Sequence, residues 1–292
     1  MQAISRTAIS LLSCSAFLLL LAASSCNTGD DIDVTPPSMA IESMSPAPAP
    51  YEVCGSTEDT VFTLRGGETL RMGLAFTDDA SLSQYKVDIH NNFDCHGHGG
   101  SSAPGVAIPN VSSLTEDWTE LSISPLSGTA QAVQLTLQAP ENVTAGVYHF
   151  QIQVLDESGN DNPLANFYSI RAINPQDEEA PALTVNLPAG QVFSAAKGSS
   201  IRFQGDVADG QSLSEGGNGL LFLSYTDLSS GNTFATDAVV VFDEGVDNHY
   251  AFDFEYTVPT TLKAGNYRFR LDAFDGVRNA AAPAFFEVTV TD

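Results

Sequence analysis

The chain has 292 residues, of which 36 are Asp or Glu and only 11 are Lys or Arg, so its formal net charge is −25 at pH 7. A surface this negative repels phosphate backbones and anionic headgroups, which argues against binding to nucleic acid or directly to lipid and favours cations as ligands. The sequence contains no G-x-S-x-G, P-loop, G-x-G-x-x-G or H-E-x-x-H motif, and no grouping of Ser, His and Asp stands out, so we do not expect an enzyme.

The first 25 residues have the pattern of a signal peptide. Arg6 is the single cation, and a short apolar stretch from Phe17 to Ala23 follows it, as in secretory signals. Residues 23–26, with the sequence ASSC, resemble the lipobox of bacterial lipoproteins, in which the cysteine is lipidated; ordinary secretion is the alternative. The acidic residues 27–33 resemble the surface-export signal of Bacteroidota-type lipoproteins. We therefore expect Cys26 to anchor the chain in the outer membrane, exposed at the cell surface.

A tether is expected behind the lipidated cysteine. The segment from Asn27 to about Pro50 is rich in Pro, Ser, Ala and acidic residues. Because such a composition buries little apolar surface, the segment is expected to be extended. The exception is Ser38 to Glu42, a plausible first strand. We place an acidic tether at residues 26–35 and expect flexibility up to about residue 50.

The rest of the chain has the pattern of β-strands. Short runs alternate apolar and polar residues and are separated by Gly, Asn, Asp and Pro, which is typical of half-buried antiparallel strands. Examples are LRMGLAFTD (70–78), YKVDIH (85–90), YHFQIQVLD (148–156) and YRFRLDAFD (267–275). Long amphipathic helical windows are missing. Strands of this length and spacing predict β-sandwiches.

An internal repeat decides the number of domains. Residues 139–160 align without a gap on residues 258–279, so that Tyr148 matches Tyr267 and Asp156 matches Asp275. We therefore predict two tandem sandwiches, at residues 36–176 and 177–292, each long enough to have its own core. The A-G-x-Y-x-F run, followed by D-x-x-x-N, resembles the penultimate strand of immunoglobulin-like and cadherin-like modules of bacterial surface proteins. The resemblance implies an all-β fold of two immunoglobulin-like domains.

Two of the four cysteines remain available for a disulfide. Cys14 leaves with the signal peptide, and Cys26 is expected to be lipidated. In an oxidising exported compartment the remaining pair, Cys54 and Cys95, is expected to form one disulfide.

Three of the five histidines lie within the stretch DIHNNFDCHGHGG, from Asp88 to Gly100. Alternation places His90 on the outer face of its strand, and it places His149 on the outer face of the strand at 148–156. In an immunoglobulin-like sandwich these two strands are the third and the sixth, which are antiparallel neighbours. His90 is therefore expected directly opposite His149, at a spacing from which two imidazoles can share a metal ion.

His96 and His98 follow in the adjoining loop and would complete a site for Zn, Cu, Ni or Fe. Asp88 and Asp94 are expected either as further ligands or as acceptors for the ring N–H groups. Cys95 would be a thiolate ligand only if Cys54 is not bonded to it. The alternative is a flexible Gly-rich loop whose histidines are merely polar.

The second copy provides a control for what the fold requires. Its counterpart of the strand at 85–90 is LLFLSYTD (220–227), which has no histidine, and Arg268 matches His149. The scaffold itself therefore does not require imidazoles at these places. His249 stands alone before a strand and is expected to be an ordinary polar residue.

The string YKVDIHNNFDCHGHGG is similar to the signature YxIDIHxNFDxHxHG of a Bacteroidota lipoprotein family known only as a domain of unknown function. The similarity covers the first sandwich, about residues 34 to 175. It maps the signature onto Asp88, His90, Asn92, Phe93, Asp94, His96, His98 and Gly99. The resemblance implies no established activity, and this chain departs from the signature by carrying Cys95 inside it.

Two loops at the other end of the first sandwich carry oxygen ligands that could bind Ca²⁺. They are Asp78 with Asp79, and the run Asp156, Glu157, Asn160 and Asp161. Asp209, Asp275 and Asn279 take similar places in the second copy. Since Asp and Asn are ordinary turn residues, turn chemistry is the favoured interpretation.

The leading hypothesis is a cell-surface lipoprotein that binds a transition metal through His90, His96, His98 and His149, for capture, sensing or metal-dependent binding of a partner. The alternative is a structural or glycan-binding accessory module of an outer-membrane nutrient-uptake system, for which Trp118 is the one tryptophan available as a sugar platform. An outer-membrane transporter or another surface protein is the expected partner. The identity of the metal and the oligomeric state do not follow from the sequence.

Overall fold

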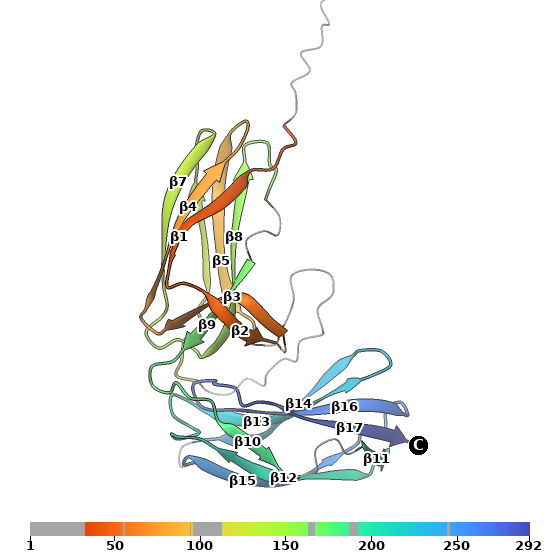
Figure 1. Cartoon of the computed structure of the whole chain (residues 1–292). Helices are drawn as coiled ribbons and strands as arrows, with labels where there is room; N and C mark the ends of the chain where they lie inside the picture. Colours follow the sequence, from red (N-terminus) through yellow and green to blue (C-terminus); the bar gives the residue numbers. More distant parts are fainter. Residues whose placement is uncertain are drawn as a thin grey trace, which may run out of the picture. The chain divides into compact units, whose positions relative to one another are not determined.

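The computed structural model describes residues 33–54, 56–93, 95, 113–162, 167–186, 192–243 and 246–292 (Figure 1). The chain divides into two units, Met1–Thr35 and Pro36–Asp292, and all of the strands lie in the second unit. Every regular element among the described residues is a β-strand. Within them no helix is both long and apolar enough to cross a membrane.

The first sandwich consists of two facing sheets. The smaller sheet has the strand order β1-β4-β7, with β1 at Ser38–Ser45, β4 at Thr69–Thr77 and β7 at Ala130–Gln138. The larger sheet has the order β2-β3-β9-β8-β5-β6, with β2 at Ala49–Val53, β3 at Ser56–Arg65, β9 at Phe167–Ile173, β8 at Gly146–Asp156, β5 at Leu82–Asn91 and β6 at Glu120–Pro125. The core between the sheets takes residues from both, such as Met72 and Phe76 of β4 and Ile152 of β8.

The second sandwich repeats this topology without a counterpart of β2. Its smaller sheet has the order β10-β12-β15, with β10 at Ala182–Val185, β12 at Ser200–Ala208 and β15 at His249–Thr257. Its larger sheet has the order β11-β17-β16-β13-β14, with β11 at Val192–Ala196, β17 at Ala284–Thr291, β16 at Gly265–Phe274, β13 at Gly219–Asp227 and β14 at Thr233–Phe242. A separate core fills it. The predicted all-β class, with two tandem sandwiches of immunoglobulin-like topology, is confirmed.

A repeated tyrosine forms a corner near the start of the same strand in each sandwich, which is β8 in the first and β16 in the second. The Tyr148 hydroxyl donates a hydrogen bond to the Thr144 carbonyl oxygen (2.8 Å), and the Tyr267 hydroxyl donates to the Lys263 carbonyl oxygen (3.0 Å). A tyrosine that bonds back to the backbone just upstream is the tyrosine corner of immunoglobulin-like sandwiches. The aligned run thus marks a scaffold feature that both copies share.

The structure differs from the sequence prediction in the segment that leads into the first sandwich. Strand β1 continues to Ser45, and β2 follows at Ala49–Val53, where a flexible tether was expected up to about residue 50. Met39, Ile41 and Met44 pack against the core. Both strands lie at the ends of their sheets, where proline is tolerated because one side of the strand needs no partner. The start of β1 agrees with the strand predicted at Ser38 to Glu42, whereas composition concealed the end of β1 and the whole of β2.

Candidate metal centre

His90 and His149 face each other across two neighbouring strands. Strands β5 and β8 are antiparallel, and His90 pairs directly with His149. The centres of the two imidazole rings lie 5.4 Å apart. Along β5 the apolar residues Val87 and Ile89 are buried, whereas His90 stays partly exposed. The predicted register is confirmed, and it follows from strand alternation together with the order of strands in this topology.

Asp88 orients the His90 ring from the same face of β5. The His90 Nδ1 and Asp88 Oδ1 atoms lie 2.9 Å apart, and the Lys86 Nζ atom lies 3.6 Å from Asp88 Oδ2. An ionised carboxylate can only accept hydrogen bonds, so Nδ1 is the donor in this pair. In the neutral ring the lone pair then resides on Nε2. Asp88 is thus placed to accept the ring N–H, which is one of its two predicted roles, and its role as a further ligand stays a prediction.

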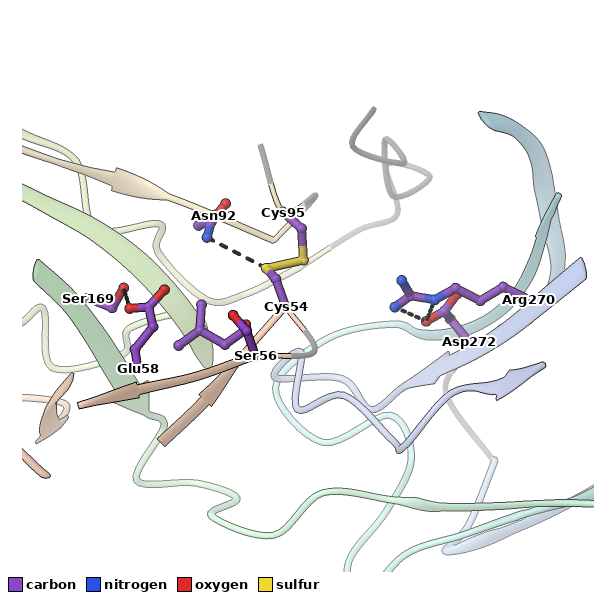
Figure 2. Close-up of a disulfide and its surroundings, with 9 residues drawn as sticks. Cys54, Ser56, Glu58, Asn92, Cys95, Ser169, Arg270 and Asp272 are labelled. Atoms are coloured by element: carbon purple, nitrogen blue, oxygen red, sulfur yellow. Dashed lines mark hydrogen bonds and ion pairs between the residues drawn. A yellow bond between two sulfur atoms is a disulfide. The ribbon is translucent and has the colours of Figure 1, made fainter. Parts of the chain in front are cut away.

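The other neighbour of His149 in the sheet brings a further carboxylate onto this face. Ser169 of β9 pairs with His149. Its hydroxyl donates to Glu58 Oε2 at 2.6 Å, as Figure 2 shows. The sequence analysis did not single out Glu58, because the place of β3 next to β9 depends on a parallel pairing between strands about 110 residues apart.

The predicted disulfide joins Cys54 to Cys95 (Figure 2). Their Cα atoms lie 5.6 Å apart, within the usual range for a disulfide. Cys54 lies between β2 and β3, so the bond ties that hairpin to the chain just after β5. Because the Cys95 sulfur is bonded, it is excluded as a thiolate ligand.

Two other residues of the histidine-containing stretch have structural roles. Asn92 is buried, and its side-chain amide donates to Cys54 Sγ at 3.7 Å. The Phe93 ring packs edge-on against Tyr148, with the ring centres 5.2 Å apart. Phe93 also lies so close to Gly146 that a Cβ atom there would be 2.7 Å from the ring. Asn92 and Phe93 thus fix the end of β5 onto the tyrosine corner.

The structure tests only part of the predicted ligand set. Asp94, His96 and His98 lie outside the described residues. Among the described residues, neither His90 nor His149 belongs to a group of three or more potential ligands whose donor atoms lie within 4.8 Å of one another. The geometry therefore brings together one histidine pair and its orienting aspartate.

The second sandwich has no imidazole at the matching place. Arg268 pairs there with Thr226 and lies 3.4 Å from Glu287, measured from the guanidinium nitrogen to the carboxylate oxygen. His249 lies at the exposed start of β15, with its Nε2 3.1 Å from Asp206 Oδ1. These contacts agree with the expectation that the scaffold requires no histidine there and that His249 is a surface residue.

Trp118 lies in the core of the first sandwich. It is 4% exposed, and its ring centre lies 6.4 Å from that of Tyr148. A sugar platform needs an exposed aromatic face, so the tryptophan that the glycan-binding alternative required is not available on the surface.

The aspartates at the opposite end of the first sandwich form the expected turns. Asp78 Oδ1 accepts hydrogen bonds from the Ala80 and Ser81 amides, at 2.9 and 2.7 Å. Asp156 accepts from the backbone and side-chain amides of Asn160. The matching loops of the second sandwich are built in the same way. In the second sandwich these loops meet a third carboxylate, Asp177, which the sequence analysis missed.

Comparison with known proteins places the first sandwich in a family. Residues 24–171 match the family model described as "Domain of unknown function (DUF4625)". No curated protein matches the chain in sequence.

Solved structures that match the chain include immunoglobulin and fibronectin(III)-like modules. The fibronectin(III)-like modules of Clostridium thermocellum CbhA are 11% identical, with 87% of this chain and 94% of that chain covered and a TM-score of 0.25. The titin Ig tandem domains are 13% identical, with 87% and 99% covered and a TM-score of 0.22. The sialic acid binding region of a Streptococcus sanguinis adhesin is 12% identical, with 89% and 78% covered and a TM-score of 0.27. At these identities the similarity concerns the fold alone.

Proposed function

The chain belongs to the DUF4625 family of domains of unknown function, and from this premise we propose that it is a surface lipoprotein whose first sandwich binds a transition-metal ion. The family match covers the first sandwich, including His90, His149 and both cysteines of the disulfide. The lipid anchor on Cys26, the outer-membrane location and the Bacteroidota signature enter the proposal from the sequence resemblance.

The observation that carries the proposal is the pairing of His90 with His149. Two imidazoles on one tetrahedral Zn²⁺, with Zn–N distances of ~2.0 to 2.1 Å, place their ring centres ~5 Å apart. The observed separation is 5.4 Å. The spacing of the two rings therefore matches that of two imidazoles that hold one ion.

The environment of the pair supports the same proposal. Asp88 holds the Nδ1 atom of His90, which is the carboxylate–histidine arrangement that fixes the tautomer of metal-binding imidazoles. The net charge of −25 lowers the cost of bringing a cation to this surface. Imidazole nitrogens select Zn, Cu, Ni or Fe over the hard cations Mg and Ca.

His96 and His98 enter the proposal from the sequence alone, as further ligands that complete the site. The disulfide places Cys95, the residue directly before His96, at the end of β5 that carries His90. With its first sandwich loaded, the protein would capture or sense the metal, or use the ion to hold a partner such as an outer-membrane transporter. The family and the fold fit a non-catalytic module.

Calorimetric titration tests the metal site. The full chain is purified in detergent without a metal-affinity tag, stripped with chelator and titrated with Zn²⁺ or Cu²⁺. We expect about one equivalent to bind, and we expect His90→Ala and His149→Ala each to weaken binding by at least ~10-fold. Asp88→Asn should weaken it by ~10- to 100-fold, as is usual for the partner of a ligating imidazole.

His249→Ala is the matched control, because it removes an imidazole that also pairs with an aspartate but lies on the second sandwich. Its affinity for Zn²⁺ should equal that of the unmodified chain. Unchanged binding in both His90→Ala and His149→Ala would overturn the proposal, because the ion would then be held by other residues. No binding to the unmodified chain would also overturn it and would leave a metal-independent accessory module.

A further inference from the structure

Three aspartate side chains converge where the segment after β9 meets two loops of the second sandwich. Asp177 lies between β9 and β10, Asp209 follows β12, and Asp275 follows β16. One carboxylate oxygen from each lies within 4.8 Å of the other two. This triad is separate from the histidine pair. The sequence analysis interpreted Asp209 and Asp275 as turn residues and did not single out Asp177.

One oxygen of each carboxylate holds its own loop in shape. The Oδ1 atoms of Asp177 and Asp209 accept from the Glu179 and Gln211 amides, at 3.1 and 3.2 Å. Asp275 Oδ1 accepts from the backbone amides of Val277 and Asn279. The Asn279 side-chain amide then bridges the triad, since it donates to Asp275 Oδ2 and to the carbonyl oxygen of Asp177. The carboxylates are therefore fixed in place.

The remaining oxygens of two of these carboxylates are buried without a partner. Asp177 is 0% exposed, and its Oδ2 accepts no hydrogen bond. Asp209 Oδ2 is also inaccessible and unpartnered. Within the described residues no Lys or Arg nitrogen lies within 4.0 Å of a triad oxygen. Arg278 interacts electrostatically with Asp275 but does not contact the triad. A buried charged oxygen without a hydrogen bond is costly, so the two unpartnered atoms indicate a missing cation.

The electrostatics of the triad agree with this. Burial, together with the nearby Asp177 and Asp209 carboxylates, raises the pKa of Asp275 to about 7. Burial and the neighbouring Asp209, Glu179 and Glu215 also raise the pKa of Asp177. Burial and the neighbouring carboxylates thus disfavour the charged forms of Asp177 and Asp275, which is the situation that a divalent cation relieves.

We propose that Asp177, Asp209 and Asp275 bind a hard divalent cation, with Ca²⁺ as the fitting ion. Ca–O distances of ~2.3 to 2.6 Å place opposite ligands up to ~5 Å apart, and the three oxygens satisfy this spacing. An all-oxygen, anionic ligand set selects Ca²⁺ over the transition metals that imidazole prefers. The ion would tie the segment that carries Asp177 to the two loops, and water would fill its remaining positions.

The first sandwich repeats part of this arrangement. Asp78 and Asp156 follow the matching strands, and their carboxylate oxygens also lie within 4.8 Å of each other. Asn160 holds Asp156 as Asn279 holds Asp275. Asp78 Oδ2 is likewise buried without a partner. The loops of the two copies thus share the hydrogen bond from Asn to Asp, and each copy contains an unpartnered carboxylate oxygen.

The test is a calorimetric titration of the full chain with Ca²⁺ up to about 10 mM, since extracellular modules bind Ca²⁺ with Kd values of ~10⁻⁴ to 10⁻³ M. We expect binding, and we expect Asp177→Asn and Asp209→Asn each to abolish one equivalent or to weaken it by at least ~10-fold. Two variants are used because each removes one unpartnered oxygen from a different loop.

Asp227→Asn is the matched control. Asp227 lies in the same sandwich and carries the same charge, but Ser229 and Ser230 satisfy both of its oxygens. Its Ca²⁺ binding should be unchanged, and so should that of His90→Ala, which separates this site from the proposed transition-metal site. The absence of Ca²⁺ binding in the unmodified chain, or binding that Asp177→Asn and Asp209→Asn leave intact, would overturn the proposal.

Discussion

The Tyr148 hydroxyl makes one hydrogen bond of the repeated scaffold, and its contribution to the free energy of unfolding can be predicted. Tyr148→Phe removes the bond to the Thr144 carbonyl oxygen and keeps the ring in the core. A buried hydrogen bond of this kind contributes ~0.5 to 1.5 kcal/mol, so the free energy of unfolding should fall by about 1 kcal/mol. Urea unfolding measures the change. Tyr267→Phe should have a similar effect, and no loss in either variant would contradict the role of the corner.

Gly146 is required for two separate reasons. Its φ of +134° is one that side chains rarely adopt, and a Cβ atom there would meet Phe93 at 2.7 Å. Gly146→Ala should therefore cost ~2 to 4 kcal/mol, from backbone strain and overpacking together. Gly128→Ala is the comparison, because Gly128 also has a positive φ of +70° but has nothing within 4 Å of its Cβ position.

Equal losses of stability in the two glycine variants would show that Phe93 does not press on Gly146. A larger loss in Gly146→Ala, measured by thermal and urea unfolding, is the expected result. That result would indicate that the contact between Phe93 and Gly146 holds the end of β5 against the start of β8. These are the strand ends that carry His90 and His149.

At the scale of elements, the disulfide holds the β2–β3 hairpin to the end of β5. Cys54 and Cys95 are 41 residues apart, and closing a loop of that length stabilises a fold by ~3 to 4 kcal/mol on the loop-entropy model. The double variant Cys54→Ser, Cys95→Ser should lose about this much in urea unfolding. A reductant should lower the stability of the unmodified chain and leave the double variant unchanged. Equal stability with and without the bond would contradict this.

The facing histidines could be predicted because two regularities were enough. Alternation assigned each residue of the strands at 85–90 and 148–154 to a face, and the strand order of the sandwich made these strands neighbours. The disulfide was predictable because the sequence analysis assigned Cys14 to a signal peptide and Cys26 to lipidation, which left Cys54 and Cys95 as the pair. Neither inference required knowledge of loops.

Other features could not be predicted because they depend on tertiary structure. Asp177 lies in an acidic segment without a periodic pattern, and it meets Asp209 and Asp275 only after the second sandwich has folded. Trp118 lies outside any strand, so alternation gave no indication that it is buried. Strand β2 contains Pro50, and composition suggested a tether because its pairing with β3 is invisible in the local sequence.

At the scale of the whole molecule, one topology is used twice with different chemistry. Both copies keep the tyrosine corner and the aspartate turns. Only the first copy pairs two histidines, across β5 and β8. In the second copy, Arg268 of β16 takes the place of His149. The two proposed sites thus differ in their donor atoms, nitrogen in one and oxygen in the other, and would suit different classes of cation.

The most direct test of the central claim is X-ray absorption at the zinc edge, on Zn²⁺-loaded protein kept in excess Ca²⁺ so that carboxylate sites are filled. We predict nitrogen ligands at ~2.0 to 2.1 Å with scattering from at least two imidazole rings, and the loss of one ring in His149→Ala. A zinc ion surrounded by oxygen alone, or an imidazole signal that His149→Ala leaves unchanged, would contradict the account.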